Sequence, residues 1–381
     1  MNLLLIGGTG VLSRAVAERA VADGHFVTVI NRGRHGNVPG CETILSDKRN
    51  YDRIGKALAG RHFDIVIDFL VFNREDSVSS FTFYSTRCDH YILVSSCFVY
   101  DFSRCGVMNE DFPRGLACWK YSAGKCGAED ALAQMAGTTP CNYTIIRPFV
   151  TYGDTRIPYS LAPAHGQDWT IIFRALSGKP LLSWDGGDGC CNIMRVEDFC
   201  DGLFGLLMNS EAFGEAVNVC GDETPRWKDV VRAVVRATGI EIPVLDLPKE
   251  FIQAHYPQRS EEIAGRSFHA VASNAKLKRL VPSFRQRFSL QDGIAKTIAA
   301  YSENGFDNGV DWAFDAKCDE VVNDWNKQND ERKRFGFVNY QNAALLRPYA
   351  NYLNGKTELG FCARVFRKCL NMGLKAAGGI K

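Results

Sequence analysis

Residues 2–32 read NLLLIGGTGVLSRAVAERAVADGHFVTVINR, and this stretch decides the fold. A short apolar run at 3–6 ends in glycines, and residues 11–22 carry apolar side chains at helical spacing. A second apolar, β-branched run follows at 26–30. A strand, a glycine turn, a helix and a second strand in this order form a βαβ unit. The two strands are therefore expected to lie parallel in one sheet.

Further apolar runs predict more strands of the same sheet. They lie at 43–45, 63–69, 90–95 and 143–147, and helical segments lie between several of them. Strands that are buried on both faces have continuous apolar runs of this kind. We therefore expect an α/β fold, with a Rossmann-type, doubly wound parallel sheet over residues 1–150 to which later strands and helices contribute.

After residue 150 the pattern changes. Gly and Pro cluster at 153–166 and 178–189, with helical stretches between and after the clusters. This predicts a smaller, irregular substrate-binding lobe over 151–305 and an appended helical extension over 306–381. The helices expected in the lobe lie near 168–177, 197–209 and 226–238.

The composition is that of a soluble globular protein, with 46% hydrophobic and 23% charged residues. It excludes a disordered chain, a collagen-like fibre and a small disulfide scaffold. The sequence has no apolar run long enough to span a membrane, and its start lacks the basic residues of a signal peptide. None of the 14 cysteines forms a C-x-x-C pair, so we expect reduced thiols, no metal site and a cytoplasmic location.

The charge is distributed unevenly along the chain. Residues 331–381 carry ten Lys and Arg and two Glu, a net charge of +8, so residues 1–330 carry −6 of the overall +2. Within this basic segment, residues 359–376 fit an amphipathic helix. Such a helix can dock on the enzyme body or a sister subunit, or lie on an anionic membrane surface, which would add peripheral membrane association. Nucleic-acid binding is the least favoured of these interpretations.

The glycine turn predicts a dinucleotide site. GGTGVLS at 7–13 stands between a strand and a helix, which is the context this motif requires. Glycines let the backbone approach a pyrophosphate, and the helix N-terminus supplies N–H groups. A tight turn without a ligand is the alternative. The expected cofactor contacts are Gly7, Thr9, Gly10, Val11 and Leu12.

The end of the second strand bears on the choice of nucleotide. NAD-binding folds place Asp or Glu here to hold the ribose hydroxyls, whereas this chain has Asn31, Arg32 and Arg34. A guanidinium can pair with the 2′-phosphate of NADP. We therefore expect NADP(H), with NAD(H) as the alternative cofactor, although the two arginines can equally be solvated loop charges.

Three side chains are candidates for catalysis. Tyr121 and Lys125 are spaced i, i+4, so they share one face of a predicted helix. An ammonium close to a phenol lowers its pKa, and such a pair can move a proton while a nicotinamide moves a hydride. Ser96 follows a buried strand, at the sheet edge where open α/β sheets bind ligands.

Together these segments resemble the extended short-chain dehydrogenase/reductases, the NAD-dependent epimerase/dehydratase family. The resemblance covers residues 1 to about 300. It rests on the order and spacing of GGTGVLS (7–13), SDKRN (46–50), DIVIDF (64–69), VSSCFVY (94–100), NEDFP (109–113), YSAGKCGAE (121–129), IIRPFVTYGD (145–154), GKPLL (178–182) and MRVEDF (194–199).

The resemblance implies a role for each matching residue. Tyr121 is the acid/base, Lys125 holds the nicotinamide ribose and tunes Tyr121, and Ser96 bonds to the reacting oxygen. The further cofactor contacts that it implies are Asp47 and Lys48 beside the adenine, Phe69, Leu70 and Val71 along the cofactor, and Phe149 beside the nicotinamide. It also implies a homodimer that pairs through the helix of Tyr121 and a neighbouring helix.

The chain departs from the family pattern at the substrate. Cys97 and Phe98 replace the Asp-Glu pair of the dehydratases, so β-elimination of water lacks its acid and base. Val150 stands where the UDP-galactose-type epimerases carry an Asn, and Cys191 where they carry an Arg that binds the diphosphate.

Other arginines could bind the substrate's anion instead. Arg195 is close to Cys191 in sequence but out of register, while Arg156 and Arg174 can be anion ligands or ordinary structural charges.

We therefore expect an NAD(P)-dependent epimerase or reductase that acts on a secondary alcohol or ketone, best matched by a nucleotide-linked sugar. The alternative is an RNA-binding or cofactor-sensing regulatory protein of the same fold.

Overall fold

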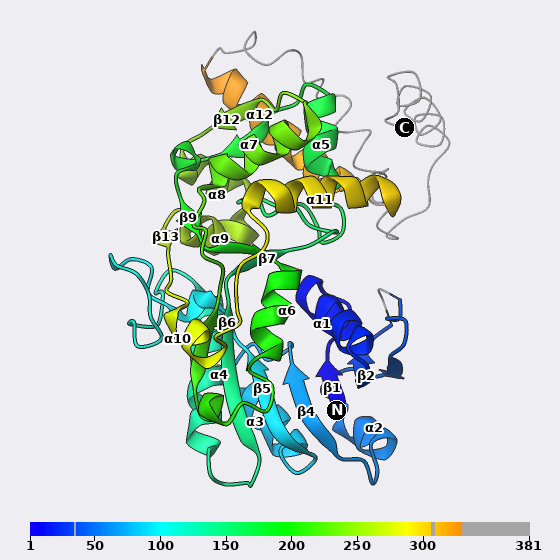
Figure 1. The fold of residues 1–381 in the computed structure, drawn as a ribbon. Coiled ribbons are helices and arrows are strands. Elements are labelled where there is room, and N and C mark those ends of the chain that lie inside the picture. Colours follow the sequence, from blue (N-terminus) through cyan, green and yellow to red (C-terminus); the bar gives the residue numbers. More distant parts are fainter. Residues whose placement is uncertain (34–35, 306–308, 330–381) are drawn as a thin grey trace.

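A parallel sheet forms the base of the molecule in the computed structural model, which describes residues 1–33, 36–305 and 309–329 (Figure 1). Its seven strands run in the order β11-β6-β5-β4-β1-β2-β3, and every neighbouring pair is parallel. The strands are β1 (Asn2–Ile6), β2 (Phe26–Asn31), β3 (Glu42–Leu45), β4 (Phe63–Asp68), β5 (Cys88–Val94), β6 (Asn142–Pro148) and β11 (Ala216–Val219). The predicted doubly wound fold is confirmed.

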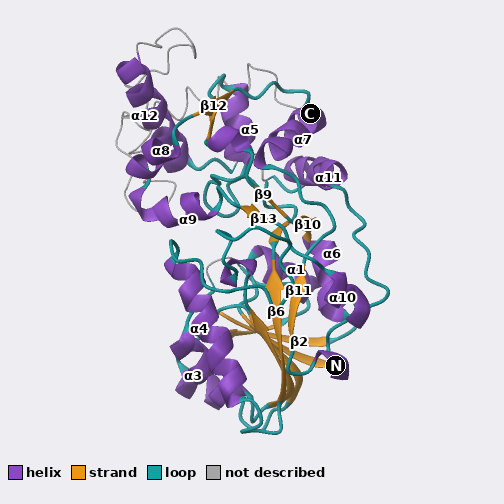
Figure 2. Cartoon of the chain, turned by 90° about the vertical axis from the view of Figure 1, so that its left-hand side faces the viewer, coloured by secondary structure: helices purple, strands orange, loops and turns teal. Residues whose placement is uncertain are grey.

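Helices cover both faces of the sheet because alternate strand residues point to opposite sides. Leu3 and Leu5 share one apolar core with α1 (Val11–Ala22), α6 (Val196–Phe204) and α10 (Ala275–Leu280). Leu4 and Ile6 share the other with α2 (Tyr51–Ala57), α3 (Arg74–Tyr84) and α4 (Lys120–Met135). Figure 2 shows the second layer, with α3 and α4 beside the sheet. All four strand side chains are at most 1% exposed, which explains the unbroken apolar runs.

A smaller lobe lies beyond the carboxyl ends of the strands (Figure 1). Its strands form three short parallel pairs: β7 (Val150–Tyr152) with β10 (Ile193–Arg195), β8 (Leu181–Ser183) with β12 (Val244–Asp246), and β9 (Cys190–Cys191) with β13 (His269–Ala270). Its main helices are α5 (Trp169–Leu176), α7 (Trp227–Thr238), α8 (Lys249–His255), α9 (Ser260–Gly265), α11 (Leu290–Glu303) and α12 (Trp312–Asn329).

Two elements that follow residue 150 show how the chain divides between the sheet and the lobe. Strand β11, which follows α6 in the chain, is the edge strand of the main sheet, and no strand is predicted there. Helix α12 belongs to the lobe by its contacts, although the sequence analysis assigns it to the extension. Arg174 of α5 pairs with Asp315 and Asp319 of α12 at 2.6 and 2.9 Å, and all three side chains are buried.

The predicted amphipathic helix at 359–376 and the rest of the basic segment lie outside the described residues. Within the described part of the chain, no helix combines the length and the apolar character needed to cross a bilayer.

Candidate active site

A cavity of about 790 Å³ lies at the carboxyl ends of the strands. Its walls are the loops that follow β1, β2, β3, β4, β5 and β6, together with α4 and two segments of the lobe. Open α/β sheets bind ligands at this edge, because the βα loops and the helix N-termini converge there.

The glycine loop forms one wall of the cavity. Gly7 has a φ of +88°, which favours glycine, and its N–H donates to the Ile30 carbonyl at 2.9 Å. A Cβ on Gly8 would clash with Val29. Gly10 precedes α1, so the free N–H groups of the first turn face the cavity. This backbone is shaped for a pyrophosphate.

Asn31 and Arg32 lie at the far end of the same wall. Asn31 Oδ1 accepts a hydrogen bond from Gly33 N at 2.7 Å, while its buried Nδ2 has no partner among the described residues. Arg32 is exposed, lines the cavity and makes no ion pair with the described residues. An orphaned donor beside a free cation fits the ribose and phosphate oxygens of a dinucleotide. The residues present therefore fit the cofactor.

Lys48 and Asp76 fix the floor of the cavity. Lys48 Nζ donates to Asp76 Oδ2 at 2.8 Å and to the Leu70 carbonyl, and Arg49 pairs with Asp76 at 2.8 Å. Burial raises the pKa of Asp76, but the hydrogen bonds from Lys48 and Arg49 outweigh it, so the pKa lies below its ordinary value. The ion pairs tie the loops after β3 and β4 together, so that Asp47 and Lys48 line the cavity.

Lys125 is the buried cation of the site. Its Nζ donates to the Val71 carbonyl at 2.6 Å and to the Val94 carbonyl at 2.9 Å, which leaves one N–H for the cavity. Burial lowers its pKa to about 8. Helix α4 can approach this closely because Gly124 faces the Phe72 carbonyl, where a Cβ would lie only 2.5 Å away.

The side chains of Tyr121 and Ser96 are neighbours in the lining of the cavity. Burial raises the pKa of Tyr121 to about 12, and the Ser96 hydroxyl opposes part of this rise. Burial therefore dominates the pKa of Tyr121, and the lowering of that pKa by Lys125 stays a prediction. The ammonium points at two carbonyls and lies 5.9 Å from the phenol ring centroid, too far to offset the loss of water.

The structure brings nearly all predicted site residues to this one cavity. Ser96, Tyr121, Lys125 and the expected cofactor contacts line it, with one exception. Val71 is 1% exposed and belongs to the core of the sheet, so its contribution is the carbonyl that holds Lys125.

Two arginines face the substrate side of the cavity. Arg156 is held by the Thr151 carbonyl at 3.3 Å and makes no ion pair with the described residues, although Asp168 and Glu262 lie within electrostatic range. Burial, and then the neighbouring charge of Arg266, lower its pKa. Two guanidiniums close together in one cavity can bind an anion between them.

Arg266 has one carboxylate partner and one unused donor. Its Nη2 lies 2.9 Å from Glu262, while its buried Nε has no partner in the described chain. The buried Cys191 thiol lies within electrostatic reach of both Arg156 and Arg266. Arg156 and Arg266 are therefore the cations nearest in effect to the position that Cys191 occupies.

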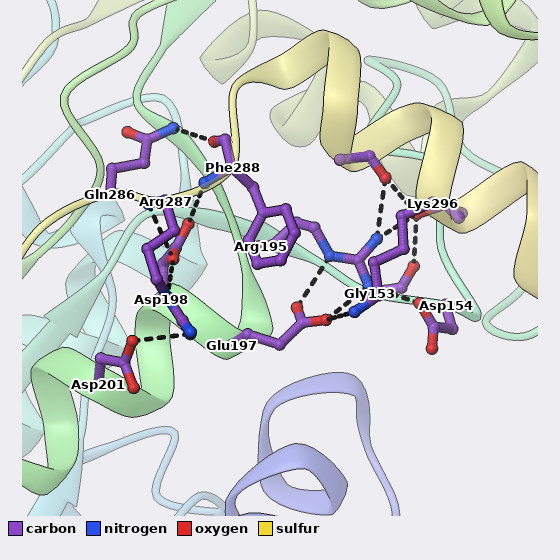
Figure 3. A network of polar contacts seen from close by, with 12 residues as sticks. Gly153, Asp154, Arg195, Glu197, Asp198, Asp201, Gln286, Arg287, Phe288 and Lys296 are labelled. Atoms are coloured by element: carbon purple, nitrogen blue, oxygen red, sulfur yellow. Dashed lines mark hydrogen bonds and ion pairs between the residues drawn. The ribbon is translucent and has the colours of Figure 1, made fainter.

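The other two candidate anion ligands are structural. Arg174 is fully buried among carboxylates of α12 and is remote from the cavity. Arg195 lies at the centre of a network that joins the lobe to α6 (Figure 3). It pairs with Glu197 at 2.8 Å and with Asp154 at 2.5 Å, and it donates to Thr297 at 2.9 Å. Every side of its guanidinium is thus occupied.

Sequence reasoning missed Arg266 and the aromatic residue Trp119 beside Tyr121. Trp119 directly precedes α4 and packs against Phe98, with ring centroids 4.3 Å apart. No local pattern around Arg266 marks it as a ligand, because the fold of the lobe alone brings it to Tyr121. For Trp119, adjacency to the catalytic helix was the only available signal.

Comparisons with known proteins agree with this geometry. A family model described as "NAD dependent epimerase/dehydratase family" matches residues 3–220. The chain is 25% identical over 311 residues to the chloroplast stem-loop binding protein of 41 kDa b of Arabidopsis thaliana, covering 77% of each chain. It is 23% identical over 264 residues to an N-acetyl-α-D-glucosaminyl-diphospho-ditrans,octacis-undecaprenol 4-epimerase of Escherichia coli O157:H7, covering 65% of this chain and 75% of that one.

The fold is similar to that of solved epimerases. UDP-glucuronic acid 4-epimerase of Bacillus cereus in complex with NAD superposes with a TM-score of 0.63 at 17% identity, over 81% of this chain and 99% of that one. The family match extends over more than half of the sequence, from the glycine loop through α4 to the end of the main sheet. This chain belongs to the NAD-dependent epimerase/dehydratase family of extended short-chain dehydrogenase/reductases.

Proposed function

We propose that the protein is an NAD(P)-dependent epimerase or reductase that acts on the carbinol carbon or ketone of a nucleotide-linked sugar. The observation that carries this proposal is the placement of Ser96, Tyr121 and Lys125 on the same cavity as the glycine loop. A hydroxyl pair and an ammonium beside a dinucleotide cleft are the groups that a hydride-transfer reaction needs.

Tyr121 and Ser96 would both contact the reacting oxygen, with different roles. Ser96 orients the oxygen by hydrogen bonding, and Tyr121 exchanges the proton with it. With a pKa of about 12 the phenol stays protonated at neutral pH, so it is ready to donate a proton to a ketone oxygen. A bound nicotinamide supplies or accepts the hydride. In the opposite direction, Tyr121 must take a proton from an alcohol, and this requires a lower pKa of its phenol. A positive charge closer to the phenol than Lys125 would lower that pKa.

The anion site of Arg156 and Arg266 supports a nucleotide-linked substrate. A diphosphate between the two guanidiniums would neutralise their mutual repulsion and satisfy Arg266 Nε. The absence of a carboxylate on Asn31 and the exposed Arg32 favour NADP(H) over NAD(H) as the cofactor.

The experiment is a two-stage assay of the purified chain. NADPH and NADH are titrated separately by nicotinamide fluorescence, with Arg32→Ala as the variant that tests nucleotide choice. UDP-, dTDP- and GDP-sugars are then added, and the products are identified by NMR. An epimerised sugar supports an epimerase, and net consumption of NAD(P)H supports a reductase. Failure of both nucleotides to bind contradicts the proposal, and preference for NADH contradicts the role of Arg32.

We also propose a cytoplasmic homodimer that pairs through α3 and α4. The exposed side chains of these helices include several small or apolar ones, among charged and polar neighbours: Val78, Ser79, Thr82, Ala123 and Ala133. Such faces suit close helix packing. Light scattering tests the mass, and Ala123→Arg is expected to give monomers.

The segment 359–376 is proposed to dock on the enzyme body or a sister subunit, with flotation on anionic vesicles as the test of membrane contact.

RNA binding, as in a regulatory relative that senses its cofactor, is the second candidate function. The Arabidopsis relative is named as a stem-loop binding protein, and residues 331–381 carry a net charge of +8. A gel shift with stem-loop RNA should compare the full chain with a chain that ends at Asn329. Loss of RNA binding with retained turnover would assign the two functions to separate parts of the chain. Absence of binding by the full chain would remove this candidate.

A further inference from the structure

Two cysteine thiols lie in contact at the end of the sheet away from the cavity. Cys88 begins β5 and Cys141 directly precedes β6, and their Sγ atoms are 3.6 Å apart in the apolar core that the sheet shares with α3 and α4. β5 and β6 are neighbouring strands, and it is their carboxyl ends that reach the cavity. Among the cysteines of the described residues, no other two sulfur atoms are in contact.

The contact makes the two thiols chemically unequal. The hydrogen bond from Cys88 lowers the pKa of Cys141, with help from the backbone N–H of Tyr91 and against the effect of burial. The same hydrogen bond, together with burial, raises the pKa of Cys88. Since the thiolate is the form of cysteine that attacks an oxidant, Cys141 is the nucleophile of the pair and Cys88 is its protonated neighbour.

The pair is reached from the loop between α4 and β6. Cys141 is 7% exposed and stands between the exposed residues Pro140 and Asn142, whereas Cys88 is 3% exposed. An oxidant close to water in size, such as hydrogen peroxide, can therefore approach the Cys141 sulfur. A bulky disulfide such as oxidised glutathione would first have to displace the loop.

We propose that Cys88 and Cys141 form a peroxide-sensitive dithiol, which hydrogen peroxide converts into an intrachain disulfide. The Cys141 thiolate attacks one peroxide oxygen, the O–O bond breaks, and the hydroxide that leaves takes up a proton to become water. The Cys141 sulfur is then a sulfenic acid. Cys88 attacks this sulfur, the S–S bond forms, and the sulfenic hydroxyl leaves with the Cys88 proton as a second water. Two thiols are oxidised, and one peroxide is reduced to two waters.

The disulfide closes the segment 88–141 into a loop. This segment runs from β5 through α4 to the start of β6, and it contains Ser96, Tyr121 and Lys125. A cross-link between its ends restricts the unfolded chain without entering the cavity, so oxidation stabilises the folded protein. Thiols that are reduced at rest and oxidise transiently are the form that redox-sensing disulfides take in reducing compartments.

The test is peptide mapping of the full chain after treatment with hydrogen peroxide. The remaining thiols are alkylated under denaturing conditions, and the chain is digested with trypsin and chymotrypsin without reduction. Cleavage after Tyr91 and Leu132 separates Cys88 and Cys141 from their nearest cysteine neighbours in the sequence. The expected product is a linked pair of peptides, lighter by two hydrogen atoms than its separate members, that dithiothreitol splits. The melting temperature should rise by about 5 °C on oxidation and return on reduction.

Matched variants show where the link forms. Cys105 and Cys118 are exposed, so both are replaced by Ser throughout, which limits pairing between chains. In this background Cys88→Ala is expected to leave a Cys141 sulfenic acid that dimedone traps, with no rise in melting temperature. Cys200→Ala removes a similarly buried thiol of α6 and should keep both the link and the rise.

Three results would each overturn the proposal. Both thiols could stay open to alkylation after peroxide treatment, Cys141 could be oxidised to the sulfinic acid without a link, or Cys200→Ala could abolish the rise as Cys88→Ala does. If Cys88→Ala does not fold, Cys88→Ser and the peptide map of the chain that retains both thiols decide the question.

Discussion

The cofactor end and the substrate end of the cleft differ in the groups that line them. Around Gly7 and Gly8 the wall is mostly backbone, shaped by one strand–turn–helix segment. Around Arg156, Arg266 and Trp119 it is made of side chains from segments far apart in the chain. A backbone wall tolerates few substitutions, whereas a side-chain wall can change its ligand one residue at a time. In the proposed function, local geometry would thus specify the cofactor and tertiary packing the substrate.

The largest expected effect is at the junction of the two ends. Tyr121→Phe should lower turnover by roughly 10²–10⁴-fold, because it removes the proton donor, while NAD(P)H affinity stays unchanged. Tyr84→Phe is the control, since the buried Tyr84 hydroxyl has no hydrogen-bond partner among the described residues. Steady-state kinetics and fluorescence titration measure both quantities. Comparable turnover in the two variants would remove Tyr121 from the mechanism.

Substitution of Arg156 should affect the substrate end alone. Arg156→Met is expected to weaken sugar-nucleotide binding about 10- to 100-fold, since one charge-assisted bond to the anion is lost. Its unfolding free energy should hold or rise, because a cation that repels Arg266 is gone. Arg174→Met should do the reverse: it leaves the buried Asp315 and Asp319 with Lys179 as their one remaining cation and costs about 3–5 kcal/mol of stability. Urea unfolding and titration calorimetry distinguish the two arginines.

Substitution of the glycine loop should affect the cofactor end alone. Gly8→Ala places a methyl group against Val29 and should cost about 1–3 kcal/mol of stability together with cofactor affinity. Gly10→Ala has room within the protein, where the nearest heavy atom is Ser13 Oγ at 3.5 Å. It should therefore keep the unfolding free energy and lose only cofactor binding. Equal stability of the two variants would contradict the packing role of Gly8.

The smallest effect is a pH dependence that arises from Lys125. Its pKa is about 8 in the folded protein, below the value of about 10.4 expected in the unfolded chain. Between these values the unfolded chain binds more protons, so this group makes the folded state more stable as pH rises. Urea unfolding of the wild type and Lys125→Met is measured from pH 7 to 10.5, and the stability of the wild type relative to the variant should rise with pH, since the other titrating groups are common to both. Parallel curves would show that the ammonium is not desolvated.

The sequence predicts the cofactor end well because its signals are local. Continuous apolar runs identify six strands, and the spacing of Tyr121 and Lys125 places both on one helix. Strand β11 escapes prediction because its four residues, AVNV, stand inside the irregular half of the chain and become a strand only by pairing with β6.

The substrate end could not be predicted in the same way. The sequence alone does not distinguish the roles of Arg174 and Arg156. In the structure Arg174 is paired with two carboxylates of α12, whereas Arg156 lines the cavity. The direction of Lys125 is equally a tertiary property, since it depends on carbonyls at the ends of β4 and β5. Residue type restricts what a side chain can bind, and the packing around it decides what it does bind.

The return of β11 and α10 to the main sheet has a mechanical consequence. The chain passes from the sheet to the lobe and back repeatedly, at β6–β7, β10–α6, β11–α7 and β13–α10. No single cut can therefore separate the sheet from the lobe into independent pieces. Several chain segments therefore connect the two walls of the cleft, and the β10–α6 segment contains Arg195 and its network (Figure 3). Any relative motion of the sheet and the lobe must therefore bend all four crossing segments at once, which restrains the width of the cleft more than a single connection would.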